Sequence, residues 1–251
     1  MNLSRRLKLV LATLLMPVFA MPLLAASPAD AVACTNPRVT LSGSNAMWSN
    51  GGYVVHNNEW NQNIPETIKA CSYRNWYVTA TANNRDGSGA VKTYPNVHKD
   101  FHNWSTGREP RVSSFTSIRS HFAAHGPRVG IYNIAYDIWL NGVPGNREIM
   151  IWTENYRQHP AGRIVARGLK FNNRTWRVFA TSDNHIITFL PDRRIESGDM
   201  RIKARLTWLK NRGMIPATST LGQICFGVEI VSTGGDPARF KFDNFDVRVT
   251  R

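Results

Sequence analysis

Residues 135–152 read Ala-Tyr-Asp-Ile-Trp-Leu-Asn-Gly-Val-Pro-Gly-Asn-Arg-Glu-Ile-Met-Ile-Trp. Two runs rich in β-branched and aromatic residues flank turn-forming residues at 141–145, which predicts two antiparallel strands joined by a short connection. Each strand carries a single acid, Asp137 in the first and Glu148 in the second. Carboxylates are depleted from strands and costly to bury alone, so both acids are candidates for a functional role.

A third acid, Glu229, lies in the similar run Phe-Gly-Val-Glu-Ile-Val at 226–231. Side chains two positions apart in a strand share a face. Each acid therefore shares its face with aromatic, sulfur-containing or small residues: Glu148 with Met150 and Trp152, Asp137 with Ala135 and Trp139, and Glu229 with Gly227 and Val231. The opposite faces hold aliphatic residues suited to a core. Any one acid could simply face solvent, but three on aromatic-lined faces predict a carbohydrate cleft.

The remaining sequence is also rich in strand signals. Apolar and aromatic runs occur at 53–55, 75–80, 128–140, 148–152, 175–179 and 186–190, with turn-forming residues at 85–89, 141–145, 172–173 and 233–237. A further strand is expected at the C-terminus. One helix is expected at 200–212, where apolar residues form an imperfect helical stripe. This pattern predicts an all-β fold, a two-sheet β-sandwich of jelly-roll type with a concave substrate cleft and one short helix.

The N-terminal residues have the features of an export signal. A basic start is followed by an apolar run at 9–25 and by small residues, which predicts a signal peptide over 1–31 with cleavage near Ala31 or Ala33. A transmembrane anchor is the alternative. With cleavage, residues 32–251 are expected to form a single catalytic β-jelly-roll domain that is secreted, extracellular and free of the membrane.

The chain contains three cysteines, and export would place them in an oxidising compartment. Cys34 and Cys71 can close a loop there, which would stabilise the fold by roughly 4 kcal/mol through loop-closure entropy. Cys225 is left over, and its apolar neighbours favour a buried, inert thiol.

The formal net charge is +14, and it falls to +12 without residues 1–31, which hold Arg5, Arg6, Lys8 and Asp30. A strongly basic chain can bind nucleic acid or an anionic cell wall. The positive charges are scattered, however, and export argues against a nucleic-acid partner. A generic basic surface is therefore favoured, with no role in nucleic-acid binding.

Several stretches resemble glycoside hydrolase family 12, which comprises secreted β-1,4-glucanases with a β-jelly-roll fold. The resemblance extends from about residue 52 to the end, and it rests on stretches at 53–60, 94–97, 135–140, 148–152, 160–162, 174–178 and 227–229. Cys71 stands at the place of that family's second disulfide cysteine. The resemblance implies that Glu148 is a nucleophile, that Asp137 supports it, and that Glu229 is the general acid/base.

Substrate-binding residues are expected beside these acids. Trp60 and Trp152 are candidates for stacking on sugar rings, although any one tryptophan could instead belong to the core. Asn58, close to Trp60, suits sugar hydroxyls, and Met150 is expected to pack beside the nucleophile.

The chain departs from the family pattern after Glu229. Residues 230–233, Ile-Val-Ser-Thr, stand where the family usually has an aromatic residue and a further acid. This change is expected to weaken a subsite on the leaving-group side of the cleft.

The sequence therefore predicts a retaining endo-β-1,4-glucanase that acts as a monomer on β-glucan polysaccharides, with no cofactor and no metal. Three alternatives stay open. One is a hydrolase specific for xyloglucan or mixed-linkage glucan. Another is a catalytically degenerate, lectin-like protein, as suggested by the change after Glu229. The last is a wall-binding protein that acts through its positive charge.

Overall fold

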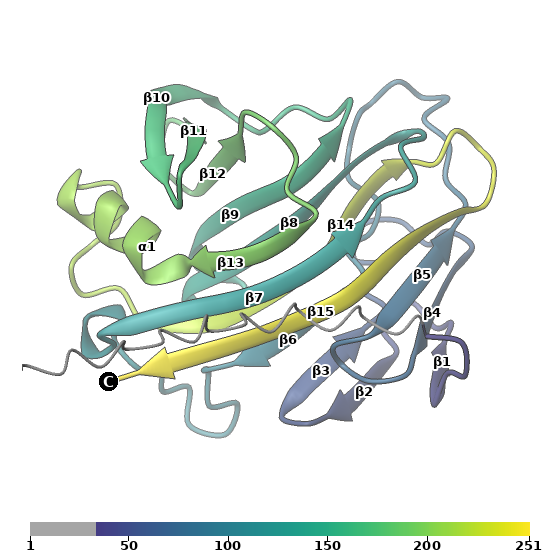
Figure 1. Ribbon diagram of the computed structural model, residues 1–251, viewed down its shortest axis with the longest axis horizontal. Helices are drawn as coiled ribbons and strands as arrows, with labels where there is room; N and C mark the ends of the chain where they lie inside the picture. Colours follow the sequence, from purple (N-terminus) through teal and green to yellow (C-terminus); the bar gives the residue numbers. More distant parts are fainter. Residues whose placement is uncertain (1–33) are drawn as a thin grey trace, which may run out of the picture. The chain divides into compact units, whose positions relative to one another are not determined.

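Two β-sheets pack against each other in the computed structural model, which describes residues 34–251 (Figure 1). The six-stranded sheet has the order β1 (Val39–Leu41), β4 (Glu66–Ala70), β5 (Trp76–Ala80), β15 (Ala238–Thr250), β7 (Ser117–His125) and β13 (Ser197–Arg201). The nine-stranded sheet has the order β10 (Arg163–Phe171), β11 (Arg174–Ala180), β12 (Ile186–Pro191), β9 (Gly145–Tyr156), β8 (Ile131–Gly142), β14 (Leu221–Ser232), β6 (Asn96–Asp100), β3 (Tyr53–His56) and β2 (Met47–Asn50). Pairing is antiparallel except between β12 and β9. The predicted two-sheet sandwich is confirmed.

The core between the sheets is aromatic at its centre. Tyr136 of β8 and Phe226 of β14 are fully buried, with ring centroids 4.6 Å apart. Phe226 also packs against Phe245 of β15 in the other sheet, at 5.7 Å. These inward residues alternate with the outward residues of the same strands, because successive side chains of a strand point to opposite faces. The inward packing therefore holds the backbone from which the outward side chains project.

The predicted helix is present as α1, Ile202–Asn211, and a short 3₁₀ turn, η1, covers Val112–Ser114. The first residues of the predicted range, Met200 and Arg201, belong to β13 instead. The helical stripe was imperfect because one core-facing position holds Arg205, whose guanidinium lies 4.3 Å from the ring centroid of Trp176. A cation stacked on an aromatic face can be buried where an aliphatic residue would be expected.

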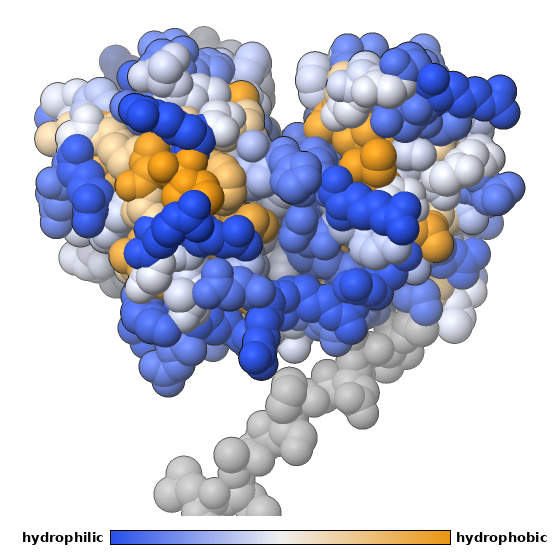
Figure 2. Space-filling view, turned by 90° about the horizontal axis from the view of Figure 1, so that it is seen from above, coloured by the Kyte–Doolittle hydropathy of each residue, from blue (hydrophilic) through white to orange (hydrophobic). Residues whose placement is uncertain are grey.

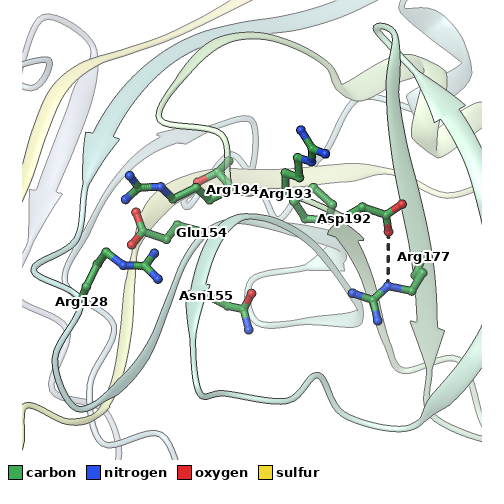
Figure 3. Close-up of a pocket in the computed structure, with 9 residues that line it drawn as sticks. Arg128, Glu154, Asn155, Arg177, Asp192, Arg193 and Arg194 are labelled. Atoms are coloured by element: carbon green, nitrogen blue, oxygen red, sulfur yellow. Dashed lines mark ion pairs between the residues drawn. The ribbon is translucent and has the colours of Figure 1, made fainter.

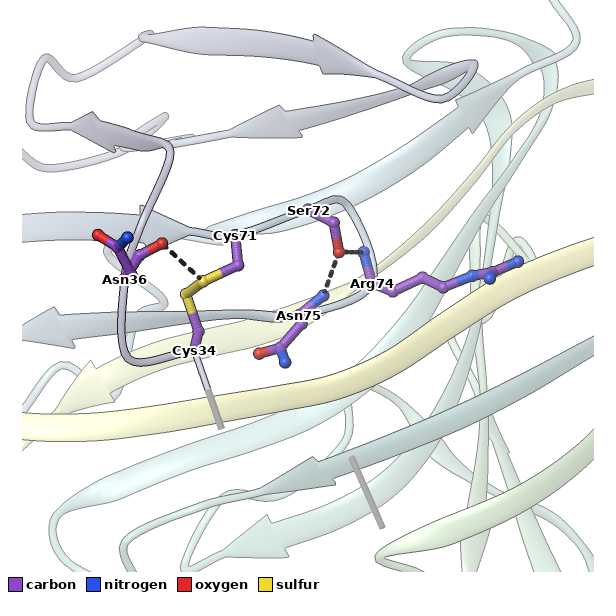
Figure 4. The surroundings of a disulfide bond; sticks show 6 residues. All are labelled: Cys34, Asn36, Cys71, Ser72, Arg74 and Asn75. Atoms are coloured by element: carbon purple, nitrogen blue, oxygen red, sulfur yellow. Dashed lines mark hydrogen bonds between the residues drawn. A yellow bond between two sulfur atoms is a disulfide. The ribbon is translucent and has the colours of Figure 1, made fainter. Parts of the chain in front are cut away.

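Cys34 and Cys71 form the predicted disulfide, which joins the beginning of the described chain to the end of β4 (Figure 4). The turn that follows is fixed locally, because the Ser72 hydroxyl accepts hydrogen bonds from the backbone N–H groups of Arg74 and Asn75. The third cysteine, Cys225, is a buried free thiol, as expected.

The predicted signal peptide and its cleavage near Ala31 or Ala33 lie outside the described residues. Within residues 34–251, no helix is long and apolar enough to span a membrane.

Candidate active site

The three acids lie on three neighbouring strands near the middle of the nine-stranded sheet, in the order β9, β8, β14. Glu148 is opposite Trp139, and Glu229 is opposite Asn133. Asp137 has Met150 on one side and Cys225 on the other. Asp137 is thus on the central strand, at a register position between those of the two glutamates.

All three acids face away from the six-stranded sheet. Their face carries a small apolar cluster that is separate from the main core and contains Ala135, Met150, Trp152 and Leu190. Figure 2 shows a notch on this side of the unit, between the side of β10 to β12 and the side that carries β2 to β5. The alternation inferred from the sequence is therefore observed, with the acids on the face opposite the main core.

Burial and mutual repulsion disfavour ionisation of this cluster. Burial raises the pKa of Asp137 well above its usual range, and the nearby charges of Glu148 and Glu229 raise it further. Burial likewise raises the pKa of Glu148 to about 7, again with a contribution from Glu229. The pKa of Glu229 is also raised to about 7 by burial, which outweighs the hydrogen bond from Asn133. The three acids are therefore not all ionised at neutral pH and hold protons that can be transferred.

Asn133 was not identified from the sequence, yet its side-chain amide donates a hydrogen bond to Glu229 Oε2. It orients that carboxyl from the neighbouring strand. The signal for it was available, since Asn133 precedes Ala135 and Asp137 at the same strand period and shares their face.

Tyr94, the first residue of the stretch at 94–97, is a second residue of the site that the sequence does not predict. Its hydroxyl donates to the Ala135 carbonyl oxygen at 3.0 Å, and the side chain is buried. Burial raises the pKa of Tyr94 well above its usual range, and Cys225 and Asp137 add to the effect. Tyr94 therefore stays protonated beside the acids and braces the middle strand.

Gly227 is required by the close approach of the next strand. A Cβ at this position would lie 2.2 Å from the Pro95 carbonyl oxygen and 2.6 Å from the Asn96 Cβ. No larger residue fits without displacing this backbone, which explains the glycine two positions before Glu229.

Several polar atoms of this face lack a hydrogen-bond partner among the described residues. They include Asp137 Oδ1, Asn133 Oδ1 and Trp152 Nε1, all buried. Buried polar groups in proteins are nearly always paired with protein or ordered water. Three such atoms around one acid cluster suit a site that receives a ligand rich in hydroxyl groups.

Trp60 stands on a fixed loop after β3, and 60% of its surface is exposed. Asn57 is fully buried and donates to Glu59 Oε1, while Glu59 Oε2 accepts from the Ile64 N–H. The Asn58 carbonyl oxygen accepts from the Tyr94 N–H at 2.9 Å. The last bond links the Trp60 loop directly to the segment that braces the acids.

The two tryptophan candidates differ in their surroundings. Trp152 is only 2% exposed and packs with Met150, which is 4% exposed, on the face that carries the acids. Trp60 offers an open ring face, whereas Trp152 offers very little of its ring. In residues 34–251, no group of three or more His, Cys, Asp or Glu side chains is arranged to hold a metal ion.

Comparisons with known proteins agree with this architecture. A family model described as glycosyl hydrolase family 12 matches residues 51–250. No curated protein matches the sequence. The xyloglucanase domain of NopAA, a type three effector from Sinorhizobium fredii solved with cellobiose, is 26% identical with a TM-score of 0.73, and the match covers 84% of this chain and 100% of that one.

Two other solved structures show the same fold. Endoglucanase cel12A from Rhodothermus marinus is 24% identical with a TM-score of 0.74, and the match covers 84% of this chain and 99% of that one. A family 12 xyloglucanase from Bacillus licheniformis is 22% identical with a TM-score of 0.72, with coverage of 84% and 100%.

Proposed function

The chain belongs to glycosyl hydrolase family 12 and is a glucan hydrolase, and from this premise we propose that it is an endo-β-1,4-glucanase that retains anomeric configuration. Its substrates would be cellulose-type polysaccharides, cleaved at internal bonds. The observation that carries the proposal is the row of three acids with raised pKa values on one outward, aromatic-lined face.

In the proposed mechanism, Glu148 attacks the anomeric carbon while Glu229 gives its proton to the leaving glycosidic oxygen. The products of this step are a glycosyl ester on Glu148 and a shortened glucan. Glu229, now ionised, takes a proton from water as the water oxygen attacks the same carbon and releases Glu148. Asp137, on the strand between them, stays protonated and would donate a hydrogen bond to the Glu148 carboxylate, orienting that nucleophile.

The raised pKa values supply the shared proton that this mechanism needs, while the assignment of roles to Glu148 and Glu229 rests on the family resemblance. The reaction begins with an ionised nucleophile and a protonated acid, and burial keeps a proton on the coupled pair up to near pH 7. Asn133 holds the Glu229 carboxyl in place. The pair can therefore reach the reactive state, with one proton shared between the two glutamates, at mildly acidic to neutral pH.

Substrate contacts are assigned to the residues around the acids. Trp60 would stack on a sugar ring, and Asn58 would bind sugar hydroxyls next to it. Met150 would shield the nucleophile, and Trp152 would form the floor of the cleft beneath the bound sugar. Export of the enzyme is part of the proposal, supported by the N-terminal sequence and by the disulfide.

The proposal is tested by assaying the protein and Glu148→Gln for new reducing ends on carboxymethylcellulose, barley glucan and xyloglucan. We expect the wild-type protein to release them, and the variant to lose at least about 10³-fold in kcat/KM. Wild-type activity in Glu148→Gln would refute the assignment.

The same assay separates the alternatives. The substrate with the highest kcat/KM distinguishes a β-1,4-glucanase from a xyloglucan or mixed-linkage enzyme. Binding of all three polysaccharides without new reducing ends would instead indicate a lectin-like protein.

A further inference from the structure

A basic pocket of about 440 Å³ lies at the ends of β9 and β12 (Figure 3). Its lining includes four arginines, Arg128, Arg177, Arg193 and Arg194, and two acids, Glu154 and Asp192. In Figure 3, Arg128 and Arg194 stand on one side, Arg177 and Arg193 on the other, and Asn155 lies between them. We call this site the arginine pocket.

The two acids leave the arginine pocket with an excess of positive charge. The Glu154 carboxylate is buried and already accepts a 2.7 Å hydrogen bond from the Tyr132 hydroxyl. Asp192 lies 3.5 Å from Arg177 Nε, and Glu196, which is outside the pocket lining, lies 2.8 Å from a terminal nitrogen of Arg194. Arg193 forms no ion pair with any residue of the described chain. Guanidinium donors thus remain available to an anion that enters the pocket.

The arginine pocket adjoins the face that carries the acids. Arg177 has the same strand parity as Phe179, which packs on the outward apolar cluster, and it is opposite Leu190 of that cluster. Asn155 is opposite Asn133, the residue that donates to Glu229. Cross-strand partners are about 5 Å apart. Asn155, in the pocket wall, therefore lies about 10 Å from Glu229, which is about the length of one or two sugar residues.

The order of the strands sets the pocket and Trp60 on opposite sides of the acids. Trp60 follows β3, the acids lie on β14, β8 and β9, and the pocket is formed at β9, β12 and β11. A glucan that crosses these strands would contact Trp60 on one side and reach the arginine pocket on the other.

We propose that the arginine pocket binds carboxylate groups carried by the substrate, so that the preferred substrate is an acidic β-glucan. Uronic acid branches or other carboxylate substituents on a β-1,4-glucan have this chemistry. The planar guanidinium fork matches a carboxylate through paired N–H···O bonds. The net charge, which is +12 without residues 1–31, adds long-range attraction for a polyanion. This inference rests on the proposed glucanase activity.

The test compares two soluble celluloses with the same degree of substitution, carboxymethylcellulose, which is anionic, and hydroxyethylcellulose, which is neutral. The pocket variant is Arg128→Gln/Arg193→Gln/Arg194→Gln. The control is Lys69→Gln/Arg239→Gln/Lys241→Gln, which removes the same charge from exposed positions on β4 and β15 of the six-stranded sheet. Initial rates are measured at about 20 mM and about 500 mM salt, where screening differs strongly.

We expect the pocket variant to lose about tenfold in kcat/KM on carboxymethylcellulose at low salt, mainly through KM, and less than twofold on hydroxyethylcellulose. The control should change both values by less than twofold. Equal losses in the two variants, or equal losses on the two polymers, would overturn the inference. If the wild-type protein hydrolyses neither polymer, it is the proposed glucanase activity that fails.

Discussion

The inward and outward faces of β8, β9 and β14 share one backbone but have opposite chemistry. Inward, Tyr136, Phe226 and Ile149 are fully buried among apolar neighbours. Outward, the acids have raised pKa values, and buried polar atoms lack partners among the described residues. The inward face therefore supplies the stability, and the rigid backbone that results holds the outward acids, which oppose folding, in place.

The magnitudes support this division. Burial of a large apolar side chain stabilises a fold by about 1.5–3 kcal/mol, and the inward faces of the three strands carry many of these. A carboxyl that must stay close to other carboxyls in a desolvated cleft opposes folding once it ionises. The stabilisation from the buried inward side chains therefore offsets the cost of holding the outward carboxyls close together.

The largest effect should come from removing the proton donor of the outward face. Glu229→Gln should lose at least about 10³-fold in kcat/KM on polysaccharide, because the leaving oxygen then receives no proton. A cellobioside with a dinitrophenolate leaving group needs no such help and should lose much less in the first step. Pre-steady-state release of dinitrophenolate measures this directly, and an equal loss on both substrates would break the assignment.

A truncation on the inward face should act on stability instead. Phe226→Ala removes a ring in contact with Tyr136 and Phe245, and it should lower the free energy of unfolding by about 3–5 kcal/mol. Urea denaturation at pH 7 measures the loss. Glu229→Gln, three residues further along the same strand, is the matched outward change and should not destabilise the protein. A comparable loss of unfolding free energy in both variants would show that the two faces do not differ in their contribution to stability.

A smaller effect should appear in the pH dependence of stability. The ordinary pKa of Glu148 is 4.5 and its folded value is about 7. The contribution of this group is therefore fully present below pH 4.5 and is lost as the pH rises through 7, since ionisation then favours the unfolded chain. The loss should be on the order of 1 kcal/mol after allowance for solvent screening.

Urea denaturation at pH 4.5, 6 and 8 checks this slope. Glu148→Gln should make it shallower, because the amide does not titrate, while Glu229 and Asp137 still contribute a slope of the same sign. A variant with an unchanged slope would mean that Glu148 ionises as readily in the folded protein as in the unfolded one.

Strand periodicity explains why the central faces could be predicted. At period two, one face of β8 is apolar from Tyr132 to Leu140, as are Ile149 and Ile151 of β9, and the other face carries the acids, so the assignment of these faces needed no tertiary information. The sequence does not predict β10, because this periodicity fails there. Gly168 has a positive φ and the pairing with β11 shifts register, so the alternation of inward and outward residues breaks there.

The parts of the site that escaped prediction depend on contacts between distant segments. Tyr94 reaches the Ala135 carbonyl oxygen across 41 positions of sequence. The arginine pocket gathers residues from the turn before β8, from β11 and from the segment after β12. No local pattern marks such groupings, because the pairing of the strands creates them.

The central claim is that Glu148 is the nucleophile of a retaining glucanase, and covalent trapping tests it most directly. The protein would be incubated with 2,4-dinitrophenyl 2-deoxy-2-fluorocellobioside, digested with a protease and analysed by tandem mass spectrometry. We predict one fluorocellobiosyl group per molecule, esterified to Glu148, with loss of activity at the same rate. Labelling of a different carboxyl, or turnover of glucan without any covalent adduct and with inverted product configuration, would contradict the account.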